Sequence, residues 1–464
     1  MDGKDWDRSG SDFPRRQIRR VVVMLCMLLP STAVGMAQGL PDTAAQEDNA
    51  LRAPVSTRAG VPLADLLEEA EANNPQLRAA KQAWDAAKLL PSQKSVLPDP
   101  EFMVSHVSVG SPRPFAGYTN SDFAYIGLGV SQEFPYPGKR GLQSDIARRE
   151  AEVASENYEA VRRSVRAEIK ETYLQLAYIF ETLETLRQEG QLLQRVQQAA
   201  DVRYRTGSGS QQDLLRAQLE QTKYLAKISH HDLAAAKLQY RLKQLLNRSP
   251  SFSDVTPSGI SETTLDSTYY DLLAAARANN PQIAAAEHRI EKQELQVDLA
   301  RKDFYPDFSI RYEWQRTDPT RFRAYYALTF GVKVPIYKGR KQEPALAQAQ
   351  TDLLRSHSDL DSQSLEVAAE LGAQYATAQR TRDLLRIYRE GLLPQATAVA
   401  ESALAGYQGG RLGFADALSA SLELSRLNGE YWQMLADHET AIARIEEITG
   451  LSLRPTQGPT AATP

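Results

Sequence analysis

The sequence Ala72-Asn73-Asn74-Pro75-Gln76-Leu77 occurs twice in this chain: it returns, ending in Ile instead of Leu, as Ala278-Asn279-Asn280-Pro281-Gln282-Ile283, 206 positions later. Three further matches follow in the same order: Leu97-Pro98-Asp99 with Tyr305-Pro306-Asp307 at 208, Phe134-Pro135 with Val334-Pro335 at 200, and Tyr204…Gly207…Asp213 with Tyr407…Gly410…Asp416 at 203. Four ordered matches at a nearly constant offset indicate two copies of one unit of about 200 residues. Chance similarity between two alanine-rich helical regions would not keep the proline and glycine signals in register.

Charge and composition limit the class of partner. The chain has 464 residues and a formal net charge of −4. Residues 1–37 hold six Lys/Arg and four Asp, so the remainder has 48 basic against 54 acidic side chains, a net charge of −6. Such a balance offers no basic footprint for phosphates, and we expect no nucleic-acid partner.

The N-terminus has the pattern of an export signal. Arg15-Arg16-Gln17-Ile18-Arg19-Arg20 precedes an apolar run, and Gly35-Met36-Ala37 is a small-x-small cleavage site. We therefore expect residues 1–37 to be a signal peptide and 38–60 to be an extended segment. The single cysteine, Cys26, lies in the apolar run. The mature chain would then have no disulfide, thiolate nucleophile or thiolate metal ligand.

Segments with a period of two indicate strands. In the second unit Phe308, Ile310, Tyr312 and Trp314 alternate with polar residues, and the first unit has a weaker version of the pattern. Segments of about ten residues with one apolar face are typical of a membrane β-barrel, but a half-buried soluble sheet has the same alternation. Aromatic residues at the strand ends and the export signal favour the membrane.

Each unit also predicts a long helical hairpin. From about Gly141 to Arg205 there is no proline and a single glycine, which at about 1.5 Å per residue predicts a rod of roughly 100 Å. At the tip of the first hairpin Gly207 suits a left-handed residue and Ser210 a helix cap. Pro394 lies inside the second long helix, where it is expected to bend it.

These patterns give the following predicted organisation. The expected ranges are a first repeat over 61–247, with strands 101–110 and 122–134 and hairpin 141–247; a linker over 248–266; a second repeat over 267–452, with strands 307–316 and 323–335 and hairpin 343–449; and a disordered tail over 453–464.

The residues give no argument for catalysis. There is no phosphate-binding glycine loop, no His-Glu-x-x-His and no paired-cysteine motif. The six histidines are scattered, and adjacent His230 and His231 point to different helix faces, so no catalytic, cofactor or metal site is expected. Asp213 and Asp416 occupy equivalent places near the two tips. They either stabilise helix termini or form a ring of charge at a narrowing, and the sequence leaves both readings open.

Closure of the sheet requires more than one chain. Four strands cannot close a barrel, and open edges in lipid leave backbone groups unpaired. Two chains would supply eight strands, enough for a filled interior, whereas three supply twelve and can leave a lumen.

This plan resembles the TolC family of outer-membrane efflux channels over about residues 61–452. The resemblance rests on the duplicated strand-strand-helix-helix unit and on two tip motifs, Tyr-x-x-Gly-x₅-Asp-Leu-Leu at 204–215 and Tyr-x-x-Gly-x₅-Asp-x-Leu at 407–418. The turn at 134–140, Phe-Pro-Tyr-Pro-Gly-Lys-Arg, is similar to the heavy-metal efflux branch of the family, the CzcC- and CusC-like proteins. The implied fold is mainly α with membrane β: a trimeric 12-stranded β-barrel continuous with a long α-helical barrel.

The resemblance also implies sites and partners. The family forms homotrimers in outer-membrane lipid that meet a periplasmic adaptor (membrane fusion) protein and an inner-membrane RND-type pump. Asp416 matches one of two acidic aperture positions, and the other falls on Ser419, which departs from the pattern. The implied docking residues at the tips are Tyr204, Gly207, Asp213, Tyr407, Gly410 and Arg411. The implied barrel-to-helix turns contain Pro135, Pro137, Gly138, Pro335 and Gly339.

The sequence thus predicts the outer-membrane channel of a tripartite efflux system in a Gram-negative bacterium, a passive duct for heavy-metal cations. A duct for drugs or other small organic molecules is the alternative within the family. A soluble periplasmic coiled-coil scaffold is the alternative from another class, and recovery in the soluble fraction would favour it.

Overall fold

The computed structural model describes residues 60–107, 124–317 and 323–453. The expected signal peptide, nearly all of the extended segment and the tail beyond residue 453 lie outside these residues, as do strand positions 108–110, 122 and 123. All described residues belong to one compact unit, residues 58–464.

Two copies of one element order follow each other along the chain. The first copy consists of α1 (Leu63–Asn73), α2 (Pro75–Ala87), α3 (Leu90–Ser95), β1 (Glu101–Val107), β2 (Tyr125–Phe134), α4 (Lys139–Arg205) and α5 (Gln211–Leu245). The second consists of α6 (Tyr269–Asn279), α7 (Pro281–Lys302), β3 (Asp307–Arg316), β4 (Tyr325–Lys333), α8 (Gln342–Ile387), a π-helical segment η1 (Tyr388–Leu392), α9 (Leu393–Gln408) and α10 (Phe414–Thr449).

Most element ends differ from the sequence expectation by a few residues. β2 begins three residues later than expected, and β4 is shorter at both ends. α4 begins two residues earlier, because Gly138 and not Gly141 ends the turn after the strand. The second tip is expected at Gly406 to Gly413, but α9 continues to Gln408, three residues into that range. Pro394 follows the π-segment η1, in which the backbone widens before the proline that cannot donate an N–H.

One asparagine in each repeated Asn-Asn-Pro stretch joins three helix ends. Asn74 caps α2, because its Oδ1 accepts from the N–H groups of Gln76 at 2.8 Å and Leu77 at 3.2 Å. Its Nδ2 donates to the carbonyl of Leu245 at 2.8 Å, at the end of α5. Asn280 repeats both bonds: it caps α7, and its Nδ2 donates to the carbonyl of Ile448 at 3.1 Å. Both amides are buried, so each one fastens a short helix to the end of a returning long helix.

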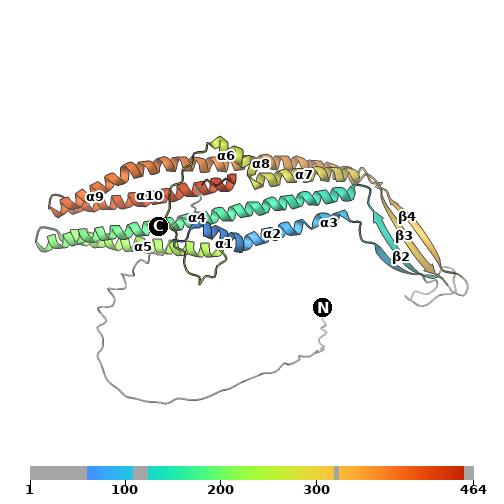
Figure 1. Ribbon diagram of the computed structural model, residues 1–464, viewed down its shortest axis with the longest axis horizontal. Helices are drawn as coiled ribbons and strands as arrows, with labels where there is room; N and C mark the ends of the chain where they lie inside the picture. The colour runs from blue at the N-terminus through green and yellow to red at the C-terminus, as the bar shows by residue number, and fades with distance from the viewer. Residues whose placement is uncertain (1–59, 108–123, 318–322, 454–464) are drawn as a thin grey trace, which may run out of the picture. The chain divides into compact units, whose positions relative to one another are not determined.

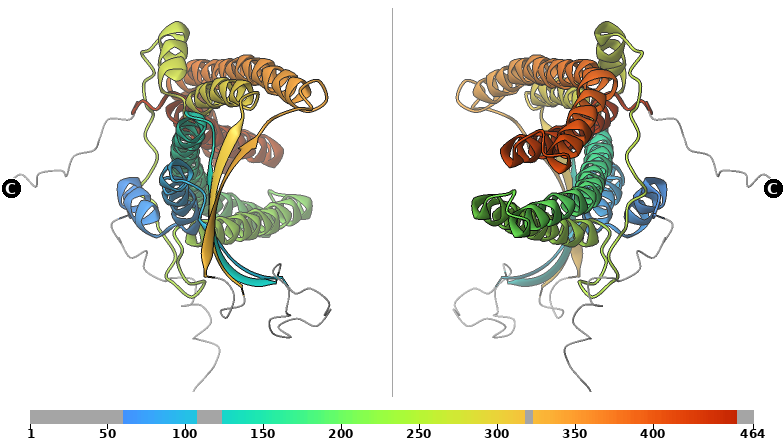
Figure 2. Two further views of the ribbon diagram at one scale, coloured as in Figure 1. Left: turned by 90° about the vertical axis from the view of Figure 1, so that its right-hand side faces the viewer. Right: turned by 90° about the vertical axis from the view of Figure 1, so that its left-hand side faces the viewer.

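Two apolar cores hold the helices of the two repeats. The first includes Leu66, Ile169, Leu176 and Leu242, and the second includes Leu272, Leu371, Ile442 and Ile445. Full burial of each such side chain contributes about 1.5–3 kcal/mol. Between the repeats, α4 packs against α7 and α10 as well as against its own partner α5. Viewed along their length, the helices form an open arc (Figure 2).

The linker between the repeats is fastened to the helices. Tyr173 of α4 accepts a hydrogen bond from the backbone N–H of Ser258 at 2.9 Å. Glu439 of α10 accepts from the N–H of Thr263 at 2.6 Å and from its hydroxyl at 2.9 Å. The linker therefore contributes to the joint between the repeats.

The four strands form one antiparallel sheet in the order β1-β2-β3-β4. β2 pairs with β3, so the central pair of the sheet joins the two repeats, with Phe134 opposite Phe308. β1 and β4 are the edge strands. The sheet lies at one end of the unit, and the turns of the two hairpins lie at the other (Figure 1). Within the described ranges, no helix combines the length and the apolar character needed to span a bilayer.

Candidate functional site

The tip of the first hairpin is a tight reversal between α4 and α5. The N–H groups of Ser208 and Gly209 both donate to the carbonyl of Arg203, at 2.8 and 2.9 Å. Gly207 has a φ of +73°, the left-handed conformation expected for it from the sequence. The Ser210 hydroxyl accepts from the N–H of Asp213 at 3.2 Å and caps the returning helix α5.

The tip of the second hairpin has the same design. The N–H groups of Arg411 and Leu412 donate to the carbonyl of Gly406 at 2.8 and 3.1 Å, and Gly410 has a φ of +72°. The carboxylate of Asp416 accepts from the N–H of Gly413 at 3.2 Å, at the start of α10. This contact is the helix-terminus role that the sequence left open.

Asp416 and Ser419 lie on the same exposed face of α10. They are three residues apart, and the Ser419 hydroxyl donates to the backbone carbonyl of Asp416 at 2.9 Å. Both side chains are exposed in the single chain. The capping bond uses one carboxylate oxygen, so the Asp416 charge remains available on this face.

The two tips contact each other through Arg203. Its Nη1 donates to the carbonyl of Tyr407 at 2.7 Å, and its guanidinium lies 5.0 Å from the centre of the Tyr407 ring. Its Nη2 donates to the carbonyl of Ser208 at 3.3 Å. One side chain thus bridges the first tip to the second.

The equivalent tyrosines of the two tips have different environments. Tyr407 is 2% exposed and packs edge-on against Phe414 with ring centres 5.7 Å apart, whereas Tyr204 is 43% exposed. Burial raises the pKa of the Tyr407 hydroxyl above its ordinary value, and nearby Asp213 raises it further. The apolar cluster between the tips comprises Val196, Ala200, Ala217, Ala403, Tyr407, Phe414 and Ala417. Tyr407 is therefore a packing residue between the hairpins, whereas the predicted docking residues Tyr204, Gly207, Gly410 and Arg411 are exposed and Asp213 is half-buried.

The turn from β2 to α4 leads into a buried lysine that pairs with two partly exposed carboxylates at and just before the start of β3. Pro135, Pro137 and Gly138 lie between the strand and the helix, and Lys139 follows directly. The ammonium group of Lys139 lies 3.0 Å from a carboxylate oxygen of Asp307 and 3.1 Å from one of Asp303. Burial lowers the pKa of Lys139, but its hydrogen bonds to these two carboxylates outweigh that effect and raise the pKa above its ordinary value.

The turn from β4 to α8 is longer than the turn from β2 to α4 and is exposed, since α8 begins only at Gln342. Pro335 and Gly339 lie in it. The N–H of Arg340 donates to the carbonyl of Tyr337 at 3.0 Å, as the N–H of Lys139 donates to that of Tyr136 at 3.1 Å. Arg340 thus resembles Lys139 in following the glycine of its turn and in this hydrogen bond, and among the described residues no ion pair joins it to an acidic side chain of the same chain.

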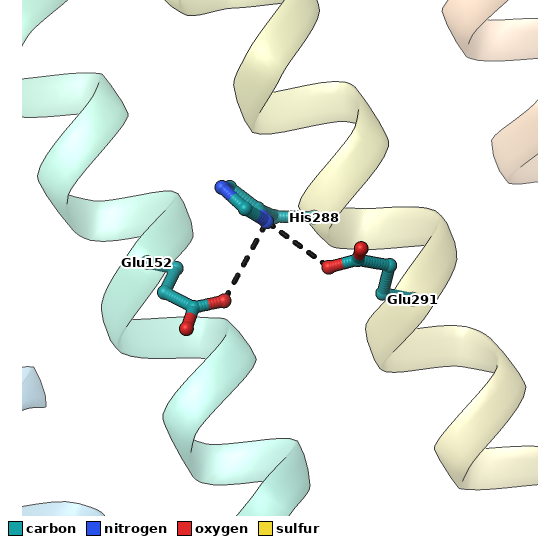
Figure 3. A group of neighbouring side chains, drawn as sticks. All are labelled: Glu152, His288 and Glu291. Carbon is teal, nitrogen blue, oxygen red and sulfur yellow. Dashed lines mark hydrogen bonds and ion pairs between the residues drawn. The ribbon is translucent and has the colours of Figure 1, made fainter.

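One group of side chains has the composition of a metal site. Glu152 of α4 and His288 and Glu291 of α7 have ligand atoms within 4.8 Å of one another (Figure 3). The guanidinium of Arg149 lies 2.7 Å from the carboxylate of Glu152 and 3.0 Å from that of Glu291. Its single positive charge is shared between the two carboxylates, and with His288 the group forms an ion-pair network between the two repeats.

Sequence reasoning missed two residues that the fold makes important. Arg203 precedes the tip motif by one position and carries no local signal, since its partner is 204 positions away. His438 is fully buried: its Nε2 lies 2.9 Å from the carbonyl of Thr263 and its Nδ1 3.0 Å from the hydroxyl of Thr381. His438 lies on α10 beside Glu439, which holds the same linker residue.

Comparisons with known proteins agree with this architecture. A curated relative, the cobalt-zinc-cadmium resistance protein CzcC of Cupriavidus metallidurans, is 24% identical over 393 residues, which cover 83% of this chain and 88% of CzcC. Among solved structures, the outer-membrane channel OprN superposes with a TM-score of 0.73 at 18% identity, covering 85% of this chain and 91% of OprN. CusC superposes with a TM-score of 0.72 at 16% identity, covering 83% and 91%. At such identities these structures show a common, TolC-like fold.

The family model named outer membrane efflux protein matches the chain in two parts, residues 66–248 and 272–451. The two matched parts correspond to the two repeats, and efflux is transport, not catalysis. The chain belongs to the outer membrane efflux protein family.

Proposed function

We propose that three copies of this chain form the outer-membrane channel of a tripartite efflux system, a passive duct from the periplasm to the exterior. The observation that carries the proposal is the four-stranded sheet with two edge strands and an exposed apolar face. Phe102 of β1 is 80% exposed and Phe330 of β4 is 70% exposed. Such edges and such a face need further strands and a lipid environment.

The open arc of helices supports the same assembly. Further copies would continue both the sheet and the arc around one axis, giving a 12-stranded barrel above a helical tunnel. The tips would then surround the periplasmic entrance. Asp416 and Ser419 would line it, and the exposed residues Tyr204 and Arg411 would be available to an adaptor protein that connects the channel to an RND-type inner-membrane pump.

Heavy-metal cations are the proposed cargo. CzcC is named for cobalt, zinc and cadmium resistance, and this is the support for a metal rather than an organic substrate. A duct needs no tight cargo site, so the pump would select the substrate. Loss of the gene should increase sensitivity to zinc, cobalt or cadmium; increased sensitivity to organic compounds alone would favour the drug-efflux alternative.

Conductance in planar lipid bilayers tests the channel function. The purified protein should insert and give single-channel currents, and Asp416→Ala should raise the conductance or weaken block by divalent cations. Asp85→Ala, an exposed acid on α2 far from the tips in sequence, is the control. Absence of any current, together with recovery in the soluble fraction, would instead favour the scaffold alternative.

A further inference from the structure

The strand pairings inside the two repeats can be compared residue by residue. In the first repeat β1 pairs with β2 so that Glu101 lies opposite Ser131. In the second repeat β3 pairs with β4 so that Ser309 lies opposite Gly331. Ser309 is 208 positions after Glu101 and Gly331 is 200 positions after Ser131, the same offsets that the repeated motifs give. The two repeats therefore share one strand register.

The β2–β3 pair serves as a template for the boundary between copies. β2 ends the first repeat's sheet and β3 begins the second's, just as β4 ends one chain's sheet and β1 would begin the next. Glu133 lies opposite Ser309 in the β2–β3 pair. The counterpart of Glu133, 200 positions later, is Lys333, and the counterpart of Ser309, 208 positions earlier, is Glu101. The β2–β3 pair therefore predicts that Lys333 lies opposite Glu101 of a neighbouring copy.

We infer that β4 of one copy pairs antiparallel with β1 of the next in this single register, with Lys333 opposite Glu101 and with Arg340 bound to Asp99 of the neighbour. The inference rests on the proposed assembly of several copies, and it names the residues that join them. The partner it commits to is a second copy of this chain.

The faces of the two strands agree with this register. It places Val332 and Phe330 of β4 opposite Phe102 and Val104 of the neighbouring β1, and all four side chains are exposed in the single chain. On the other face it places Gly331 opposite Met103, as Gly129 lies opposite Met103 inside the chain. A slip by one residue would move every apolar side chain of β1 to the opposite face.

The charges agree as well. Asp99 is the counterpart of Asp307 at the offset of 208. Arg340 corresponds to Lys139 as the basic residue that directly follows the glycine of the turn, one position beyond the offset of 200. Inside the chain Lys139 and Asp307 form the ion pair at 3.0 Å, with Lys139 only 6% exposed. In the single chain Asp99 and Arg340 are both exposed. Closure of the sheet would bring these two groups together in the same strand-to-helix turn, and opposite charges across the strand pair at Glu101 and Lys333 add to this.

Disulfide trapping tests the register. In a Cys26→Ser background, Glu101→Cys with Lys333→Cys places two Cβ atoms directly opposite, about 4.5–5.5 Å apart, which mild oxidation can bridge. The expected product is a covalent trimer on non-reducing gels. The matched control is Met103→Cys with Lys333→Cys, on the same face but displaced by two residues, at about 7–8 Å. It should cross-link at least about tenfold less.

The outcomes separate the register from the assembly. One outcome overturns the register and leaves the proposed channel intact. In it the protein is a trimer by light scattering and conducts, but the control pair cross-links as well as or better than the Glu101–Lys333 pair, or neither pair cross-links. A monomer without conductance overturns both.

Charge exchange tests the ion pair. Asp99→Arg and Arg340→Asp should each reduce the fraction of trimer that survives in detergent by about tenfold, and the double exchange should restore it. Lys338→Asp, in the same turn but without a predicted partner, is the control. Single variants that match this control, or a double exchange without rescue, would overturn the pairing of Asp99 with Arg340.

Discussion

Arg203 is expected to hold the two hairpin tips together, and its removal should release them. A hydrogen bond from a charged donor contributes about 1.5–3 kcal/mol, and a cation–π contact at an exposed site about 0.5–1 kcal/mol. Arg203 makes one contact of each kind with Tyr407. The site is partly exposed, so water replaces part of both contacts in the variant, and we expect a loss of about 2 kcal/mol per copy. This corresponds to roughly a 30-fold shift toward separated tips.

Single-channel recording of Arg203→Ala measures this shift. If the tips surround the entrance, the ratio of open to closed dwell times should rise by an amount of that order, or the mean conductance should rise. Arg205→Ala is the matched control, because Arg205 is two residues further on the same helix and pairs with Asp201 on the surface. Traces of Arg203→Ala that cannot be distinguished from those of the unaltered protein and of the control would refute the bridging role.

Two further predictions concern stability. Asn280→Ala removes a helix cap, worth about 1 kcal/mol, and leaves the Ile448 carbonyl without its amide donor, at about 1–3 kcal/mol, so denaturant unfolding should show a loss of about 2–4 kcal/mol. Gln282→Ala, which removes an exposed side-chain bond, should cost much less, and an equal loss in both variants would contradict the capping argument. Burial raises the pKa of Glu189 above its ordinary value although Asn428 donates to it, so the fold favours the protonated form. The contribution of Glu189 to the stability of the fold is greatest below the ordinary carboxyl pKa of about 4.3. This contribution is lost as pH rises through the higher folded-state pKa. Glu189→Gln should therefore raise Tm at about pH 7 and change it little at about pH 4, and the reverse pattern would contradict the sign.

The local features of the fold could be predicted because their causes are local. Pro75 begins α2, as expected from its missing N–H, and Gly207 has the left-handed backbone that its place after a helix required. The strand periodicity located all four strands to within a few residues. Strand ends were less certain, since the hydrogen bonds that define them depend on the neighbouring strand, which the periodicity does not specify.

Long-range contacts could not be predicted for a different reason. Tyr204 and Tyr407 stand in the same motif, yet one is exposed and the other buried. Phe414 packs on Tyr407 across the turn of the same hairpin, and Arg203 of the first hairpin reaches Tyr407 only after the two hairpins pack. Similarly, two roles for Asp416 remained open from the sequence alone. The capping contact with Gly413 is now visible, and the role at an aperture stays a prediction that conductance can test.

The two buried asparagines have a consequence for the conditions under which the helices stay joined. Asn74 and Asn280 use both ends of a neutral amide, one as acceptor and one as donor. An amide neither gains nor loses a proton over the range in which carboxylates and imidazoles titrate. Acidification that alters the ion pairs elsewhere in the molecule should therefore leave these two joints unaltered.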